Sequence, residues 1–330
     1  MTVPEILAAL PTLSALVVGD ICLDRWCTYD PATAEPSRET GIPRIGVVRT
    51  EVTPGAGGTV ANNLAALGVG RVAVLGAVGD DGFGFELRRA LDARRIRANH
   101  LVTVPDLQTF TYTKLINGVT GVEDHPRLDF ISTRPLARDV EQRIATDLGT
   151  LASQFDAVLV ADQAETDQGG VVAPAVREAI AELAARAPGK VFWVDSRMRP
   201  ELFRRVIVKP NQQEADAACL RRFGRVDYQA LRRDIEAPLL VVTHGGDGAL
   251  LLTGDGEQWI KTRKVVKPVD ICGAGDSFSA GAAMALAAGG SPAQAARFGN
   301  LVASITIMKK GTGTASPEEV LKAADEHARD

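Results

Sequence analysis

The sequence predicts a doubly wound, Rossmann-like α/β fold with a mostly parallel sheet and a small inserted β-sheet. Three observations support this class. Short apolar segments alternate along the chain with longer segments of helical period. Most of the apolar segments end in polar residues, as strands buried on both faces do. Two other segments alternate at the period of a strand and lack a helical pattern. Strands alternating with helices favour a parallel sheet that is covered on both faces.

Six apolar segments are predicted as buried strands because each is short, rich in β-branched residues and bounded by polar residues. They are residues 15–24, 70–81, 155–162, 190–195, 204–211 and 238–252. Segments with apolar residues at helical spacing predict helices between them. These are residues 58–68, 82–96, 135–153, 171–187 and 276–289. Since ligands of open α/β sheets bind beyond the carboxyl ends of the strands, we expect the site at that edge.

Two segments, 24–54 and 108–132, interrupt this order. Both contain stretches that alternate between apolar and polar residues, and the first is rich in proline and threonine. We expect them to form antiparallel strands inserted into the α/β body, where a small sheet would serve as a lid. The chain shows no internal repeat and no low-complexity linker. We therefore expect a single domain, 1–330, with two lid insertions.

Composition limits the classes of partner. The net charge of −4 gives no electrostatic footprint for nucleic acid. No polybasic run indicates a membrane surface, and the longest apolar run, around 280–288, is too short to span a bilayer. The first 20 residues contain no Lys or Arg and are a poor signal peptide. Cysteines occur only at Cys22, Cys27, Cys219 and Cys272, without a zinc or disulfide pattern, so a cytoplasmic location is expected.

The segment "DICGAGD", residues 270–276, is followed by a run of small apolar residues that predicts a helix. Asp276 at the start of this helix could be an ordinary cap, because Asp satisfies unpaired N–H groups there. The alternative is chemical. Gly273 and Gly275 can adopt conformations that point successive N–H groups into one concavity, which suits a developing negative charge. Asp276 at the rim could then accept the proton of an attacking hydroxyl.

Two common nucleotide motifs are missing. The chain has no GxxxxGK[ST] loop and no GxGxxG after its first predicted strand. The second absence argues against a dinucleotide-dependent oxidoreductase.

Residues 270–276 resemble the C-terminal signature D-T-x-G-A-G-D of the ribokinase, or PfkB, carbohydrate kinases, with Ile271 at the Thr position. Other stretches resemble family elements in the family's order. They are the Gly-Gly signature at 55–68, G-x-D-x-x-G at 79–84, N-x-x-E at 209–215, the nucleotide loop T-x-G-x-x-G at 243–248 and the adenine-side helix and loop at 299–317. The resemblance spans nearly the whole chain and implies a ribokinase-like fold and ATP-dependent carbohydrate kinase activity.

Within this family, the N-terminal half is similar to the heptose-phosphate kinase subgroup. The stretches "VVGDICLDRW", "PSRETGIPRIGV" and "TPGAGGTVANNLAALG" follow that subgroup's layout, as do residues 113–115 and 127–129. Enzymes of this subgroup often carry a fused nucleotidyltransferase domain, which 330 residues are not expected to accommodate.

The resemblance implies a role for each matching residue. Asp276 would be the catalytic base, and Gly273, Ala274 and Gly275 would form the anion hole. Substrate contacts would be made by Asp24, Gly57, Gly58 and Thr59. Nucleotide contacts would be made by Asn211, Thr243, Gly245, Gly248 and Asn300. Glu214 would act with Asn211 in organising Mg²⁺ through water. Asp270 and the Cys272 carbonyl fall where relatives bind a monovalent cation such as K⁺.

Several of these residues have a second interpretation. Asp24 could be a turn residue. Lys114 and Arg127 would suit a phosphorylated sugar, or they could be exposed charges that protect edge strands. The family's substrate Asn aligns with Thr59, so either Thr59 or one of Asn62 and Asn63 supplies that contact. Cys272 could be a reactive thiol or a small packing residue.

These observations predict an ATP-dependent kinase that phosphorylates a hydroxyl of a sugar or sugar phosphate. A nucleoside kinase of the same fold is one alternative, because Trp26, Tyr29, Phe110 and Tyr112 lie in the lid segments. A non-catalytic sugar-sensing protein is another, although Asp276, Asn211 and Glu214 are all present. The expected cofactors are ATP and Mg²⁺, with K⁺ as an open case, and pairing of lids suggests a homodimer.

Overall fold

The computed structural model describes residues 1–166 and 168–329. In this part of the chain, nine strands form the larger sheet. In sheet order they are β13 (Gly256–Ile260), β12 (Ala249–Thr253), β11 (Leu240–Thr243), β10 (Ile207–Val208), β9 (Val191–Ser196), β8 (Ala157–Asp162), β1 (Ser14–Gly19), β4 (Arg71–Gly79) and β5 (Arg97–Val104). The strands from β11 to β5 are all parallel, and β12 and β13 continue the sheet antiparallel. The expected mostly parallel sheet is thus confirmed.

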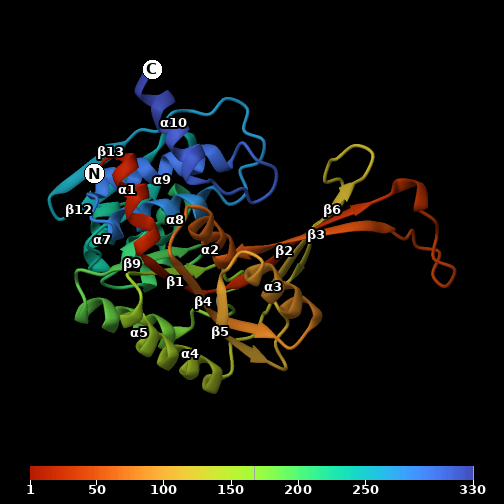
Figure 1. Cartoon of the computed structure of the whole chain (residues 1–330). Helices are drawn as coiled ribbons and strands as arrows, with labels where there is room; N and C mark the ends of the chain where they lie inside the picture. Colours follow the sequence, from red (N-terminus) through yellow and green to blue (C-terminus); the bar gives the residue numbers. More distant parts are fainter. Residues whose placement is uncertain (167, 330) are drawn as a thin grey trace.

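Helices cover both faces of this sheet (Figure 1). One face packs against α1 (Val3–Ala9), α2 (Gly57–Ala66), α3 (Gly82–Asp92), α8 (Ala274–Ala287), α9 (Pro292–Thr306) and α10 (Pro317–Arg329). The other packs against α4 (Arg138–Leu151), α5 (Pro174–Arg186), α6 (Gln212–Phe223) and α7 (Tyr228–Asp234). Side chains of strand β1 pack in both cores, because successive side chains of a strand point to opposite faces of the sheet. Ala15 and Val17 join the first core, and Leu16 and Val18 the second.

Three predicted strands are shorter or divided. The segment 15–24 breaks at Asp20, because Gly19 adopts a φ of +127° and turns the chain from β1 into the second sheet. The segment 238–252 divides into two strands at a turn, 245–247. Gly248 ends this turn with a φ of +113°. The segment 204–211 keeps only the two residues of β10, since Pro210 and the N-terminus of α6 follow.

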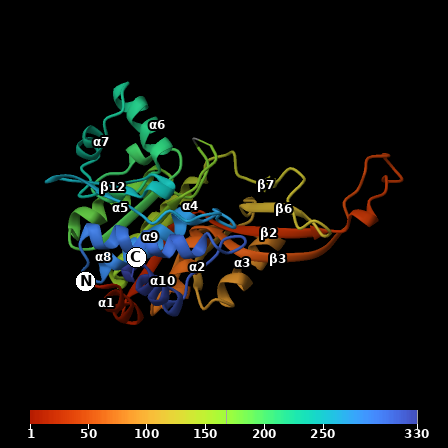
Figure 2. The same ribbon diagram turned by 90° about the horizontal axis from the view of Figure 1, so that it is seen from above.

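The smaller sheet contains β3 (Val47–Ala56), β2 (Ile21–Tyr29), β6 (Thr111–Asn117) and β7 (Leu128–Phe130), in that order. Its strands come from the two segments expected to be inserted, and in Figures 1 and 2 they project from one side of the body. The expectation of purely antiparallel pairing is wrong at one place: β2 and β6 pair parallel. They belong to separate excursions of the chain, and both run outward from the body, so no hairpin constrains them.

No helix in the described ranges has the length and apolar character needed to cross a bilayer.

Candidate active site

The turn before α8 has the conformation that its glycines suggested. Gly273 caps the helix with a φ of +77° and a ψ of +8°, the left-handed region that glycine occupies without strain. Ala274 and Gly275 are the first helical residues, so their N–H groups have no intrahelical partner, and Ala274 N donates to Ile271 O of the preceding turn at 3.2 Å. Asp276 lies in the first turn. This arrangement combines a helix N-terminus that attracts anions with a carboxylate beside it.

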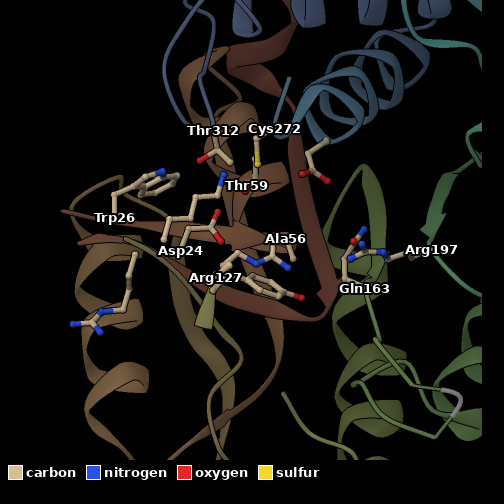
Figure 3. A pocket seen from close by; sticks show the side chains of 13 residues that line it. Asp24, Trp26, Ala56, Thr59, Arg127, Gln163, Arg197, Cys272 and Thr312 are labelled. Carbon is tan, nitrogen blue, oxygen red and sulfur yellow. The ribbon is translucent and has the colours of Figure 1, made fainter. Parts of the chain in front are cut away.

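A cavity of about 120 Å³ lies between this turn and the smaller sheet (Figure 3). It brings together residues that are distant in sequence. Its lining consists of Asp24, Arg25, Trp26, Ala56, Thr59, Tyr112, Lys114, Arg127, Gln163, Arg197, Cys272, Asp276 and Thr312. Of the predicted substrate residues, Asp24, Thr59, Lys114 and Arg127 line it, together with the predicted base Asp276. We call it the acceptor cavity.

Asp24 extends from β2 into the acceptor cavity (Figure 3). The neighbouring strand makes room for it through Gly55, because a Cβ atom there would lie 2.4 Å from Asp24 Oδ1. Burial raises the pKa of Asp24 to about 6, while the positive charges of Lys114 and Arg127 act in the opposite direction. Asp24 is therefore a desolvated acceptor that faces the cavity.

Four cations line the acceptor cavity, each paired with an acid, and Arg25 Nε lies 3.2 Å from Glu86 Oε2. Lys114 Nζ lies 3.6 Å from Glu123 Oε2, and Arg197 Nη1 donates to Glu165 Oε1 at 2.7 Å. Arg127 donates from Nε and Nη2 to Asp129, both at 2.6 Å, and lies over the ring of Tyr112. These pairs hold the cations at the wall, and Arg127 Nη1 takes no part in its pair. The wall can thus receive an anion without new side-chain ordering.

The glycine pair at the start of α2 has a packing role. A Cβ on Gly57 would lie 2.8 Å from Ile21 Cδ1, and one on Gly58 would lie 2.6 Å from Pro54 Cβ. Neither glycine lines the acceptor cavity, whereas the preceding Ala56 does, with a strained φ of +49°. The two glycines let α2 approach the sheet closely enough for Ala56 and Thr59 to reach the cavity.

Thr59, and not Asn62 or Asn63, lines the acceptor cavity. The Thr59 hydroxyl donates to Pro54 O at 3.2 Å, and it can still accept a hydrogen bond. The Asn63 side chain is fully buried and donates back to Thr59 O at 3.0 Å. Of the three residues considered for this contact, only Thr59 is therefore at the cavity wall.

A second cavity, of about 340 Å³, adjoins the opposite side of the glycine turn. We call it the nucleotide cavity. Its lining includes the predicted residues Thr243, Gly245, Gly248, Ala274, Gly275 and Asn300. Apolar side chains such as Val265, Phe278 and Ile307 form much of the rest. Among the described residues, no acceptor pairs with the buried Asn300 Nδ2. An unpaired donor in an apolar cavity fits the ring nitrogen of a purine.

Asn211 and Glu214 form a capping box at the start of α6. Asn211 Oδ1 accepts from Glu214 N at 2.9 Å, and Glu214 Oε2 accepts from Asn211 N at 2.7 Å. Burial, together with the nearby Asp195, raises the pKa of Glu214 to about 6, against the opposing charge of Lys209. Within the described ranges, no cluster of three acidic, His or Cys side chains could hold a metal alone. The residues present thus fit Mg²⁺ carried on phosphates and held through water.

Asp270 organises the loops beside the glycine turn. Its Oδ1 accepts from Cys272 N at 2.9 Å, and its Oδ2 accepts from Gly311 N at 3.1 Å. The same 311–312 loop touches the smaller sheet: Thr312 and Thr53 hydroxyls lie 3.3 Å apart. Burial raises the pKa of the Cys272 thiol, so this thiol is not an activated nucleophile.

Asp276 lines the acceptor cavity and directly follows Ala274 and Gly275, which line the nucleotide cavity. Burial raises the pKa of Asp276 to about 7, helped by the negative charges of Asp195, Asp24 and Glu214 and opposed by Lys209. A carboxyl with a pKa near neutrality suits a general base, because it is ionised enough to accept a proton and basic enough to hold it. The geometry supports proton abstraction from a group in the acceptor cavity.

Sequence reasoning did not assign several residues of this region. Gln163 and Arg197 line the acceptor cavity directly after β8 and β9, and Thr312 approaches it from the loop after α9. Lys209 and Asp195 form a buried ion pair with an Nζ–Oδ2 distance of 2.7 Å. The signal available for Gln163, Arg197 and Asp195 was their position at the carboxyl ends of strands. Thr312 had no comparable signal.

Comparison with known proteins agrees with this geometry. The model of the family described as "pfkB family carbohydrate kinase" matches residues 16–319. The bifunctional protein HldE of Trichlorobacter lovleyi is 30% identical over 97% of this chain, and that of Caulobacter vibrioides is 32% identical over 97%. The chain spans 64% and 66% of the length of these two relatives. A ribokinase from Thermotoga maritima shares the fold, with a TM-score of 0.71 at 22% identity over 95% of this chain and 99% of that one.

Proposed function

The chain belongs to the pfkB family of carbohydrate kinases, and from this premise we propose that it transfers the γ-phosphate of ATP to a hydroxyl of a sugar or sugar phosphate. The observation that carries the proposal is the position of Asp276 and the glycine turn between two cavities. One cavity is polar and charged, and the other is mainly apolar. A phosphoryl donor and a hydroxylated acceptor bound in them would meet at the turn.

In this mechanism Asp276 accepts the proton of the attacking hydroxyl. The turn of Gly273, Ala274 and Gly275 would stabilise the charge of the transferred phosphoryl group, as an anion hole does, and Ala274 N would exchange its present partner, Ile271 O, for the phosphoryl group. Asp24 accepts hydrogen bonds from acceptor hydroxyls and fixes their orientation. Thr59 adds a further acceptor at the cavity wall. These residues supply orientation, a base and charge stabilisation, which are the main protein contributions to phosphoryl transfer.

Asn300 and the loop of Thr243, Gly245 and Gly248 would hold the nucleotide. Asn211 and Glu214 would hold Mg²⁺ through its water ligands, and the ion supplies neutralisation of the phosphate charges. Asp270 could join a monovalent cation site with the Cys272 carbonyl. Both Asp270 oxygens already accept backbone N–H groups, so a cation there would add a bond to an ordered carboxylate.

We propose that the acceptor is phosphorylated. Lys114, Arg127 and Arg197 gather in a cavity of about 120 Å³, and guanidinium groups bind phosphate bidentately. The similarity of the N-terminal half to heptose-phosphate kinases agrees with this substrate class. An uncharged nucleoside would leave these cations without a new partner.

We also propose that the chain is a single kinase domain whose smaller sheet acts as a lid and pairs with a second copy. The outer residues of β3, including Val47 and Val48, are exposed. Strands with unpaired apolar edges commonly associate. Size-exclusion chromatography coupled to light scattering should give the mass of a dimer. The Val48→Glu variant should give a mass closer to that of the monomer.

An ADP-release assay over a panel of acceptors tests the proposed activity. The panel contains heptose phosphates, hexose phosphates, the corresponding free sugars and nucleosides. We expect turnover with at least one phosphorylated sugar and a higher kcat/KM than for its unphosphorylated form. Higher kcat/KM with a nucleoside would favour a nucleoside kinase. Sugar binding without ADP release, in the presence of Mg²⁺ and K⁺, would favour a non-catalytic sensor.

A further inference from the structure

A single buried lysine lies directly behind the glycine turn. Lys209 follows β10 and is 3% exposed. Its Nζ lies 2.7 Å from Asp195 Oδ2, and a Cβ built on Gly275 would lie only 3.2 Å from that Nζ. Ser279, one turn into α8, donates to the same Asp195 oxygen at 3.2 Å. The ammonium group is thus paired with a carboxylate that Ser279 also holds, and it lies beside the turn that leads into Asp276.

The charges around Lys209 explain why a cation is needed there. Four carboxylates act on this small volume: Asp195 from β9, Asp24 from β2, Glu214 from α6 and Asp276 itself. Burial acts to lower the pKa of Lys209, but Asp195 and the other carboxylates outweigh it and raise the pKa overall. Lys209 therefore carries a positive charge throughout the working range of pH.

Stability alone is a weak reason for this ion pair. Burying two charges costs desolvation, and buried ion pairs can often be replaced by apolar side chains without loss of stability. A fixed cation beside a site that must receive polyanionic phosphates has a clearer purpose. Lys209 offsets Asp195, which would otherwise add uncompensated negative charge next to both the base and the incoming phosphoryl group.

We propose that Lys209 is a positioning residue for phosphoryl transfer, whose buried ammonium neutralises Asp195 and gives the Gly275 turn and the Asp276 carboxylate a permanent positive neighbour. The role of Asp276 as base rests on the proposed function. The electrostatic coupling between Lys209, Asp195 and Asp276 does not, and it can be measured without turnover.

Titration of Asp276 in three variants tests the coupling. The protein is labelled with ¹³C at the aspartate carboxyl carbon, and the Asp276 resonance is identified by its loss in Asp276→Asn. Lys209→Met removes the cation and should raise the pKa of Asp276 by about one unit. Asp195→Asn removes the anion and should lower it by about one unit. The double variant should return the pKa close to the wild-type value.

The opposite signs separate this proposal from a purely structural role. If the pair were purely structural, both single variants would have lower thermal stability. The pKa of Asp276 would then stay unchanged, or would shift in the same direction in both variants. Either result overturns the proposal. If Lys209→Met does not fold, Asp195→Asn and the double variant still test the proposal, because Asn keeps the shape of Asp and the double variant carries neither charge. The proposal is contradicted if the pKa of Asp276 does not fall in Asp195→Asn.

A matched control removes a cation elsewhere. Arg221 pairs with Glu201 and lines neither cavity. Arg221→Met should leave the pKa of Asp276 unchanged. In the acceptor assay, the acid limb of kcat/KM should move with the titrated value, to higher pH in Lys209→Met and to lower pH in Asp195→Asn. Coupling in the titration without any activity would leave the electrostatic coupling of Lys209, Asp195 and Asp276 established, and would reject the kinase function and with it the role of Lys209 in phosphoryl transfer.

Discussion

Asp24 and Asp276 line the same cavity from two different parts of the fold. Asp24 lies on β2 of the smaller sheet, whereas Asp276 lies in the first turn of α8. The negative charge of Asp24 is one of the influences that raise the pKa of Asp276, after burial and Asp195. An acceptor bound between the two would donate from one hydroxyl to Asp24 for orientation, and its attacking hydroxyl would give its proton to Asp276.

The first prediction concerns acceptor binding. Asp24→Asn should raise KM for the acceptor at least tenfold, because a charged hydrogen-bond acceptor typically contributes about 1.5–3 kcal/mol. The Kd for an ATP analogue, measured by calorimetry, should change less than twofold. Glu51→Gln is the matched control, since Glu51 is an exposed acid on the neighbouring strand β3. An equal loss of nucleotide affinity in Asp24→Asn would contradict the assignment.

A substitution at Gly55 tests the position of Asp24 without changing Asp24 itself. A Cβ on Gly55 would lie 2.4 Å from Asp24 Oδ1 and would displace the carboxylate from its position. Gly55→Ala should therefore raise KM for the acceptor while sparing ATP affinity. Gly82→Ala serves as control, because a Cβ there meets nothing within 4 Å and should stabilise α3 slightly, by about 0.4–1 kcal/mol. Wild-type KM in Gly55→Ala would show that Asp24 does not need its present position.

Asn300 should discriminate the nucleotide. Its Nδ2 is buried and, within the described residues, has no acceptor. Asn300→Leu should weaken ATP binding about tenfold, by losing one hydrogen bond to the base. The fold should tolerate the change, since an unpaired polar group is removed. Calorimetry with ATP and thermal unfolding without ligand measure the two effects. Unchanged ATP affinity would place the base elsewhere.

Stability should depend on pH through Asp276. Its pKa is raised to about 7 in the folded protein, so the unfolded chain loses this proton at lower pH than the native state does. The wild type therefore loses stability as pH rises from about 4 to about 7, and the loss persists above. Asp276→Asn removes this penalty.

Thermal unfolding at two pH values measures this dependence. The Tm of Asp276→Asn should exceed that of the wild type by about 2–4 °C at pH 8, and the difference should shrink toward pH 5. Glu51→Gln should show no such pH dependence. A Tm difference that grows as the pH falls would reverse the sign and reject the raised pKa.

The sequence predicted the parallel sheet, the two excursions and the glycine turn, because these depend on local patterns: apolar runs, alternation and a distinctive motif. It did not predict that β2 and β6 pair parallel, since nothing local specifies which strands of two separate excursions meet. The break at Asp20 was missed because apolar residues lie on both sides of Gly19 and Asp20, so the pattern of 15–24 predicts one strand although Gly19 has a positive φ.

The candidate site shows the same division. Asp276 follows a recognisable turn, and Asp24 was predicted at the end of a strand although it lies inside β2; the geometry brings both to one cavity. The roles of Lys209 and Gly55 could not be predicted, because they depend on contacts with residues distant in sequence. Lys209 pairs with Asp195, and Gly55 leaves room for Asp24. Motif matching assigned Gly57 and Gly58 to substrate contact, whereas they pack against Ile21 and Pro54. Spacing along the chain does not distinguish a glycine that faces a ligand from one that faces a neighbouring strand.

The most direct test of the central claim is the turnover number of Asp276→Asn with the best phosphorylated-sugar acceptor at pH 8. We predict a loss of kcat of about 10²–10⁴-fold, with ATP affinity within about twofold of the wild type, because a positioned base contributes that much to proton transfer. A kcat within a few-fold of the wild type in a folded, ATP-binding variant would show that Asp276 is not the base.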